Sequence, residues 1–238
     1  MKKILLALSI AALALTQSVH AENADERASI RTNLATEYYK IGQYAIAIDE
    51  AKKAISANSK YFQAYNLLGL SYWALKDNVT AEGYFKQAVD IAPTDSDVNH
   101  NYGNFLCAAG NPTAAMVRFN TALQNTLYAT PENTMQAAGI CAEKNNDLVT
   151  AKEWFQRIIA RRPDNLSAKF HLSNLSIKSA DLPEAKRLFL EMYKTMRPAP
   201  AELLWLGVKI EHGIGNKVAE NRYASELKTN FPDSLEAT

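Results

Sequence analysis

The stretch YNLLGLSYWALKDNVTAEGYFKQAVDIAP, residues 65–93, predicts two short helices that pack against each other across a tight turn. Small and apolar residues recur at helical spacing, and they are Tyr65, Leu68, Gly69 and Tyr72 in the first helix and Ala81, Phe85 and Ala88 in the second. Asp77 and Asn78 favour a turn between the helices. Pro93 ends the second helix, because a proline ring clashes with the preceding helical turn.

The same pattern recurs along the chain. Copies of it start near residues 28, 62, 96, 132, 166 and 200, at steps of 34, 34, 36, 34 and 34 residues. A 34-residue period with these residue types is the signature of the tetratricopeptide repeat (TPR), which is one helix-turn-helix unit. We therefore expect an all-α fold, a TPR superhelix (α-solenoid) of six helix-turn-helix repeats that forms one domain at residues 22–238. An irregular all-α domain is the alternative, and six copies in register argue against it.

The first 21 residues have the features of a secretory signal peptide. Two lysines precede an uncharged, mostly apolar run at residues 4–16, and Val19 and Ala21 are the small residues expected just before a cleavage site. The apolar run is shorter than the roughly 20 residues that a membrane-spanning helix needs. We expect cleavage near Ala21 and export to the periplasm. An uncleaved membrane anchor is the alternative.

The charge balance does not favour nucleic acid or an anionic membrane surface as a partner. Removing residues 1–21 deletes two of the 26 basic residues and no acid, which leaves 24 basic and 25 acidic residues. This near-neutral balance gives no indication of nucleic acid or of an anionic membrane surface as a partner. His100, His171 and His212 lie far apart, and no Cys or His pair has metal-ligand spacing. We expect neither a metal site nor a cofactor.

Catalytic motifs are missing as well. The sequence contains no GxSxG, no HExxH and no glycine-rich phosphate loop. Pairs of acids, such as Asp49 with Glu50 and Glu143 with Asp147, are expected on solvent faces or turns, where most charged residues lie. We therefore expect a protein without enzymatic activity.

One face of the first helices has the chemistry of a binding surface. In the usual geometry of the repeat, positions 2, 5, 9, 12 and 13 of each first helix face the concave side of the superhelix. These positions hold polar and aromatic residues, which include Tyr39, Asn66, Leu70, Trp73, His100 and Asn104. Side-chain amides at such spacing can bind the backbone of an extended peptide. Ordinary solvated side chains are the alternative explanation.

The chain contains two cysteines, Cys107 and Cys141, in the first helices of repeats three and four. Neighbouring first helices pack side by side, and nearby thiols oxidise in a periplasm-like compartment. We therefore predict a Cys107–Cys141 disulfide, which closes a loop of about 34 residues. Two buried free thiols that pack as small apolar groups are the alternative.

The segment from Asn99 to Pro163 resembles one family in particular. It contains NYGNFLCAAGNPTAAMVRFNTALQN at residues 101–125, the insert LYATP at 127–131 and AAGICAEKNNDLVTAKEWFQRII at 137–159. The pairing of the two cysteine motifs across this insert is similar to that of the type IV pilus biogenesis/stability proteins, the PilW-type, pilotin-like TPR proteins. The resemblance extends over nearly the whole mature chain, and it implies that Cys107 and Cys141 are bridged.

The resemblance also implies a function. Such proteins are non-enzymatic scaffolds that bind the outer-membrane secretin subunit of the type IV pilus and support its localisation and multimerisation, and other pilus assembly proteins are further candidate partners. The expected contact region lies in the early repeats, at Tyr38, Tyr39, Tyr65, Asn66, Leu70 and Trp73. A general peptide-binding adaptor or chaperone of the cell envelope is the alternative function.

The N-terminal region departs from the family pattern. Many relatives carry a lipobox cysteine directly after the signal, whereas this chain reads TQSVHAENAD at residues 16–25, and its first cysteine is Cys107. We therefore expect no direct lipid anchor. Association with the outer membrane is expected through a partner.

Overall fold

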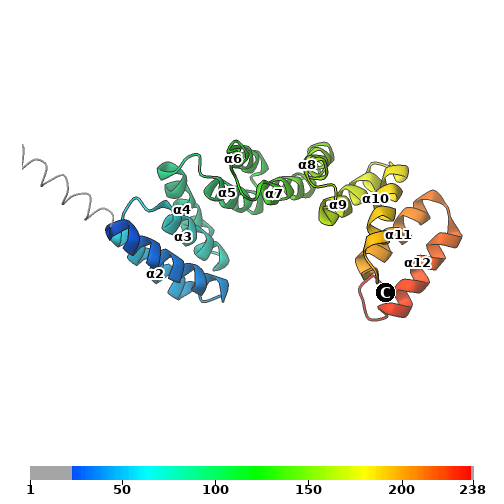
Figure 1. The fold of residues 1–238 in the computed structure, drawn as a ribbon, viewed down its shortest axis with the longest axis horizontal. Helices are drawn as coiled ribbons and strands as arrows, with labels where there is room; N and C mark the ends of the chain where they lie inside the picture. The colour runs from blue at the N-terminus through cyan, green and yellow to red at the C-terminus, as the bar shows by residue number, and fades with distance from the viewer. Residues whose placement is uncertain (1–22, 237–238) are drawn as a thin grey trace, which may run out of the picture. The chain divides into compact units, whose positions relative to one another are not determined.

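The computed structural model describes residues 23–236, and every regular element in that range is an α-helix (Figure 1). The expected signal peptide at residues 1–21 lies outside the described residues. The first helix spans residues 23–40. It is followed by α2 (Tyr44–Ala57), α3 (Phe62–Ala74), α4 (Asn78–Ile91), α5 (Ser96–Ala108), α6 (Pro112–Leu123), α7 (Pro131–Lys144), α8 (Leu148–Arg161), α9 (Leu166–Lys178), α10 (Leu182–Thr195), α11 (Ala201–Ile214) and α12 (Lys217–Asn230).

These helices form six helical hairpins, each made of a first helix (A) and a second helix (B). The described A helices after the first begin at residues 62, 96, 131, 166 and 201, each within one residue of the start expected from the repeat pattern. The described part of the first A helix already starts at residue 23, before the expected start near 28, and within this part Ala28 packs against Ala54 and Ala64. The predicted all-α TPR solenoid of six helix-turn-helix repeats is confirmed.

Side-chain caps define where most of the helices begin. An aspartate or asparagine precedes the helix, and its carboxylate or amide oxygen accepts a hydrogen bond from the backbone N–H three residues later, which satisfies a donor that has no partner within the helix. Seven helices begin in this way, with the caps Asp77, Asp95, Asn111, Asp147, Asn165, Asp181 and Asn216. In Asp77, for example, Oδ1 accepts from the backbone N–H of Thr80 at 3.1 Å.

The core of each hairpin repeats from one B helix to the next. An alanine near the start of the B helix and a phenylalanine one turn further are fully buried in four successive hairpins: Ala81 and Phe85, Ala115 and Phe119, Ala151 and Phe155, Ala185 and Phe189. The small residue lets the two helices approach, and the large ring fills the space beside it. The pattern of signature positions in the sequence is therefore a pattern of core packing.

The chain divides into two units, Met1–Ala129 and Thr130–Thr238. Unit 1 contains three hairpins, from the helix at residues 23–40 to α6, and unit 2 contains three more, from α7 to α12 (Figure 1). The boundary lies within residues 124–134, where the repeat step lengthens to 36 residues. A buried cluster of unit 2 lies in its last two hairpins and includes Phe189, Leu204 and Tyr223.

The two cysteines, Cys107 of α5 and Cys141 of α7, are both disulfide-bonded. The chain contains no other cysteine, so the alternative of two free thiols is wrong. None of the helices between residues 23 and 236 has the length and apolar character needed to cross a bilayer. Within the same residues, no group of histidine, cysteine and acidic side chains is arranged to hold a metal ion.

Candidate protein-interaction surface

The eight residues predicted to bind a partner all lie on the A helices of unit 1. Tyr38 and Tyr39 belong to the helix at residues 23–40, four more residues belong to α3, and His100 and Asn104 belong to α5. All eight are partly buried, so each has some surface that a partner can reach. The four residues on α3 are Tyr65, Asn66, Leu70 and Trp73.

A hydrogen bond between two side-chain amides joins two neighbouring A helices of this surface. Nδ2 of Asn101 on α5 donates to Oδ1 of Asn66 on α3 at 3.3 Å. Asn66 was predicted as a site residue and Asn101 was not. The bond uses one lone pair of the Asn66 carbonyl and leaves its NH2 group without a bond to another described residue. Asn66 therefore presents an oriented donor to a bound backbone.

His100 and Asn104 form a second polar pair one turn apart on α5. Nδ2 of Asn104 lies 2.9 Å from Nε2 of His100. Burial lowers the pKa of His100, although the nearby carboxylate of Asp97 opposes this shift. A neutral imidazole is therefore favoured, and its Nε2 can accept the hydrogen bond from the asparagine amide.

The aromatic residues of the surface are fixed by their neighbours. The indole of Trp73 meets the ring of buried Phe105 edge-on, with centroids 5.8 Å apart. The hydroxyl of Tyr65 donates to the backbone carbonyl of Ser59 at 3.0 Å. The ring centroids of Tyr39 and Tyr44 lie 5.5 Å apart. Burial, with a smaller contribution from Tyr44, raises the pKa of Tyr39. These side chains form a preorganised surface, because contacts within unit 1 already restrict their rotamers.

Three hydrogen bonds between A helices share a register that was not predicted from the sequence. Each of the three joins a residue to the one 35 positions later, one more than the repeat period. The pairs are Asn66 with Asn101 in unit 1, and Glu143 with Lys178 and Asn174 with Lys209 in unit 2. Asn101, Lys178 and Lys209 could have been found by looking for polar residues at this spacing. The A-helix face of unit 2 therefore has the same kind of ladder as that of unit 1, with charged members.

Comparison with known proteins places these features in a family. A tetratricopeptide-repeat family model matches residues 32–96. The crystal structure of PilW, described as a widely conserved type IV pilus biogenesis factor, is 31% identical with a TM-score of 0.77, and the match covers 88% of this chain and 96% of PilW.

PilF of Pseudomonas aeruginosa is a more distant relative. The type IV pilus assembly protein PilF is 21% identical over 212 residues, which are 89% of this chain and 84% of PilF. A solved structure of Pseudomonas aeruginosa PilF has a TM-score of 0.77, 21% identity and coverage of 90% of this chain and 96% of that chain, and it shows the same fold. The chain therefore belongs to the tetratricopeptide-repeat family of type IV pilus biogenesis proteins that includes PilW.

Proposed function

We propose that this chain is a non-enzymatic periplasmic scaffold that binds the outer-membrane secretin subunit of the type IV pilus and supports its localisation and multimerisation. The observation that carries the proposal is the 31% identity to PilW, a type IV pilus biogenesis factor, over 96% of the PilW chain. TPR proteins act by holding other polypeptides on the surfaces of their stacked hairpins. Export to the periplasm, with cleavage near Ala21, is part of the proposal.

The A-helix surface of unit 1 supports a role in peptide binding. It combines the exposed part of Leu70 with the amides of Asn66 and Asn104 and the partly exposed ring of Trp73. An apolar contact next to fixed hydrogen-bonding groups suits an extended segment, whose backbone needs donors and acceptors at regular intervals. Because the surface is already ordered, little conformational entropy is lost when the segment binds.

A substitution of Leu70 gives the sharpest test. In a strain that lacks the gene, complementation with Leu70→Glu is expected to restore the protein but not the secretin multimers seen on unreduced gels. The added carboxylate would be desolvated against the apolar part of the segment, which weakens binding by about tenfold or more. Far-UV circular dichroism and thermal melting of the purified variant check that unit 1 remains folded.

The matched control places the same substitution on a B helix. Val79 lies in the first turn of α4 and is 86% exposed, so Val79→Glu changes the charge equally without touching the A-helix surface. This variant is expected to restore secretin multimers fully. Normal multimers and normal twitching in the deletion strain itself would remove the proposal. Capture of several unrelated envelope proteins, with no enrichment of the secretin, would instead favour the general adaptor or chaperone.

A further inference from the structure

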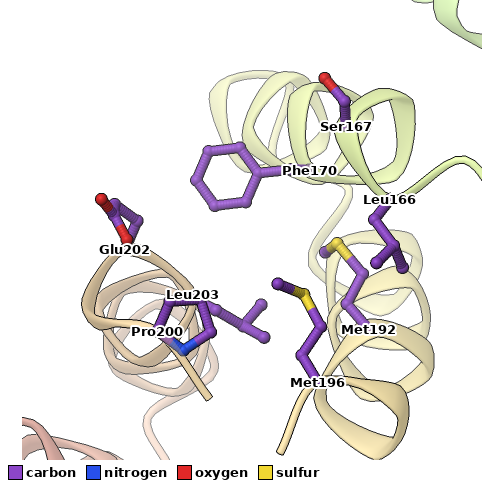
Figure 2. A pocket seen from close by; sticks show the side chains of 8 residues that line it. All are labelled: Leu166, Ser167, Phe170, Met192, Met196, Pro200, Glu202 and Leu203. Atoms are coloured by element: carbon purple, nitrogen blue, oxygen red, sulfur yellow. The ribbon is translucent and has the colours of Figure 1, made fainter. Parts of the chain in front are cut away.

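A pocket opens in unit 2 where α9, α10 and α11 meet, and none of the eight residues assigned to the first surface lines it. Its volume is about 240 Å³. Figure 2 shows Met192 of α10 and Met196, which directly follows α10, reaching toward Leu203 of α11, with Phe170 of α9 beside them. The full lining is Leu166, Ser167, Phe170, Met192, Met196, Pro200, Glu202 and Leu203.

The chemistry of the pocket suits one apolar side chain. Its floor is part of the core, because Met192 and Leu203 belong to the buried cluster in the last two hairpins of unit 2. Methionine side chains are flexible and polarisable, so Met192 and Met196 can adjust to apolar groups of different shape. A volume of this size takes a leucine, methionine or phenylalanine side chain and does not enclose a larger ligand.

Two charged residues without an ionic partner lie on α11, one at this pocket and one further along the helix. The exposed carboxylate of Glu202 is at the rim, and among residues 23–236 it forms no ion pair or side-chain hydrogen bond. Nζ of Lys209 donates to Oδ1 of Asn174 at 2.8 Å and has no carboxylate partner within the described range. Burial, together with the nearby charge of Lys178, lowers the pKa of Lys209. Lys209 is therefore a partly desolvated cation that lacks a counterion.

The neighbouring charges do not supply that counterion. Lys178 is bonded to Glu143 at 2.8 Å, and Lys169 is bonded to Glu191 at 2.7 Å. Both acids therefore already have cationic partners. A carboxylate brought to Lys209 would complete the ladder between α9 and α11, where Asn174 now provides only a neutral acceptor.

Helix geometry sets the distance between the two charges. Glu202 and Lys209 are seven residues apart and lie on one face of α11, which corresponds to about 10 Å along the axis. Trp205, which is 41% exposed, lies between them on the same face. Along the axis of α11, the rise from Leu203, which lines the pocket, to Lys209 is about 9 Å by the same measure, and an extended chain covers this rise in about three residues.

We propose that this surface, formed by the pocket, Glu202, Trp205, Asn174 and Lys209, binds an extended segment of a protein partner with a defined charge pattern. The segment places an apolar side chain in the pocket. A cationic residue next to it faces Glu202, and an aspartate or glutamate three residues further along lies at Lys209. The surface is separate from the one assigned to the secretin, so the proposal goes beyond the proposed function and stands or fails independently of it.

Two short peptides of identical composition test the charge pattern. The probe is the acetylated and amidated pentapeptide Lys-Leu-Ser-Ser-Asp, and its control exchanges the charges, Asp-Leu-Ser-Ser-Lys. Isothermal titration calorimetry on the purified mature chain is expected to show binding of the probe at least about tenfold tighter than binding of the control, because the control places like charges against Glu202 and Lys209. Equal affinity for the two peptides would overturn the proposal, and so would absence of binding at millimolar concentration.

Matched variants test the two ends of the surface. Lys209→Met keeps the aliphatic stem and removes the charge, and it is expected to weaken probe binding about tenfold through the loss of a charge-assisted hydrogen bond. Lys228→Met on α12 is the control and is expected to leave the affinity unchanged. Ser167→Trp fills the pocket from its exposed rim and is expected to abolish binding of the probe. Ser225→Trp, at an exposed position of α12, is its control and is expected to have no effect. Unchanged affinity in Lys209→Met would refute the role of the lysine.

A second copy of the chain is the competing occupant of the surface. Analytical ultracentrifugation of the mature chain, with and without Ser167→Trp, distinguishes a second copy of the chain from a segment of another protein. A monomer in both cases supports the peptide-binding proposal. Self-association that disappears in Ser167→Trp would show that the pocket is covered by another copy, and the proposal would then be wrong.

Discussion

Gly103 of α5 lies directly against the ring of Phe119 on α6. A Cβ atom at Gly103 would be 2.6 Å from Cε1 and 2.7 Å from Cδ1 of Phe119, closer than real Cβ atoms approach another heavy atom. The ring is fully buried, so it has little room to move aside. The same relationship recurs at 2.8 Å between Gly69 and Phe85 and between Gly139 and Phe155. The glycine of the repeat signature is therefore required by the large ring that faces it.

Gly103→Ala is expected to destabilise unit 1 by about 1–3 kcal/mol, which is the usual cost of overpacking a core. The added methyl group forces apart α5 and α6 or displaces the ring of Phe119. Urea unfolding followed by circular dichroism measures the change. Adding Phe119→Leu to Gly103→Ala is expected to recover part of the loss, because the smaller side chain leaves space for the methyl group.

Gly83→Ala provides a control with the opposite sign. Gly83 lies within α4, and a Cβ atom there would have no heavy atom within 4 Å. Alanine is a better helix former than glycine, so the substitution is expected to stabilise the protein by about 0.5–1 kcal/mol. Equal effects at Gly83 and Gly103 would show that the contact with Phe119 does not determine the outcome.

Much of the fold could be predicted because its repeat is a packing rule. Residues such as Gly69, Ala81 and Phe85 appear in the sequence at fixed spacing and pack together in the structure for that reason. Asp77 was expected in a turn, and its side chain caps α4. Local signals of this kind depend only on residues within one hairpin, so a single copy of the pattern contains them.

Interactions between hairpins were harder to predict. Glu50 was expected on a solvent face next to Asp49, but it is buried and bonded to Arg31, 19 residues earlier, and to Lys53. Glu143, also expected at the surface, is partly buried and bonded to Lys178 and His171. Apart from Lys53, which is on α2 with Glu50, these partners lie on neighbouring helices, and helical periodicity within one helix does not specify which of its polar residues meet the next.

The candidate surface shows the same limit. The eight residues assigned to it do lie on A helices and remain partly exposed, as their positions in the repeat predict. Asn101 was missed because its contact with Asn66 follows the 35-residue register between helices and not the 34-residue repeat. The pocket beside Met196 was missed for a different reason, since three helices from two hairpins contribute to it and no single segment contains the pattern.

The disulfide is expected to stabilise the chain substantially. Cys107 and Cys141 close a loop of about 34 residues, which corresponds to roughly 3–4 kcal/mol in the chain-entropy description of the unfolded state. In urea unfolding, the double variant Cys107→Ser/Cys141→Ser is expected to have a free energy of unfolding that is lower by that amount. A thiol assay under denaturing, non-reducing conditions is expected to detect no free thiol in the wild-type protein. Stoichiometric reaction of two thiols would contradict the bond.

The buried carboxylate of Glu211 depends on one cation. Its side chain is 2% exposed, and Nζ of Lys186 lies 2.9 Å from its Oε1. Lys186→Met is expected to destabilise unit 2 by about 1–3 kcal/mol, because a buried charged acceptor loses its partner. The double variant Lys186→Met/Glu211→Met removes both charges and is expected to recover most of the loss. Thermal melting of Lys186→Met, Glu211→Met and the double variant gives the coupling, and an unchanged midpoint in Lys186→Met would show that the pair contributes nothing.

The buried carboxylate of Glu50 is expected to make stability depend on pH. Hydrogen bonds from Lys53 and Arg31 lower the pKa of Glu50 below its ordinary value of 4.5. A carboxyl group with a lowered pKa in the folded state stabilises the protein fully above its unfolded pKa, and it loses this contribution as the pH falls through the folded pKa. The free energy of unfolding of the wild type should therefore exceed that of Glu50→Gln by about 1 kcal/mol at pH 7.

The decisive measurement is how that difference changes with pH. Urea unfolding of wild type and Glu50→Gln at several pH values between 7 and 3 is expected to give free energies of unfolding that converge below about pH 4.5, since protonated Glu50 then resembles glutamine in charge. Glu37→Gln is the control, because Glu37 pairs with Lys40 while both side chains remain more than 60% exposed, and exposed pairs contribute little. A Glu50→Gln difference that stays constant from pH 7 to pH 3 would show that the ionised carboxylate is not what stabilises the helix at residues 23–40 against α2.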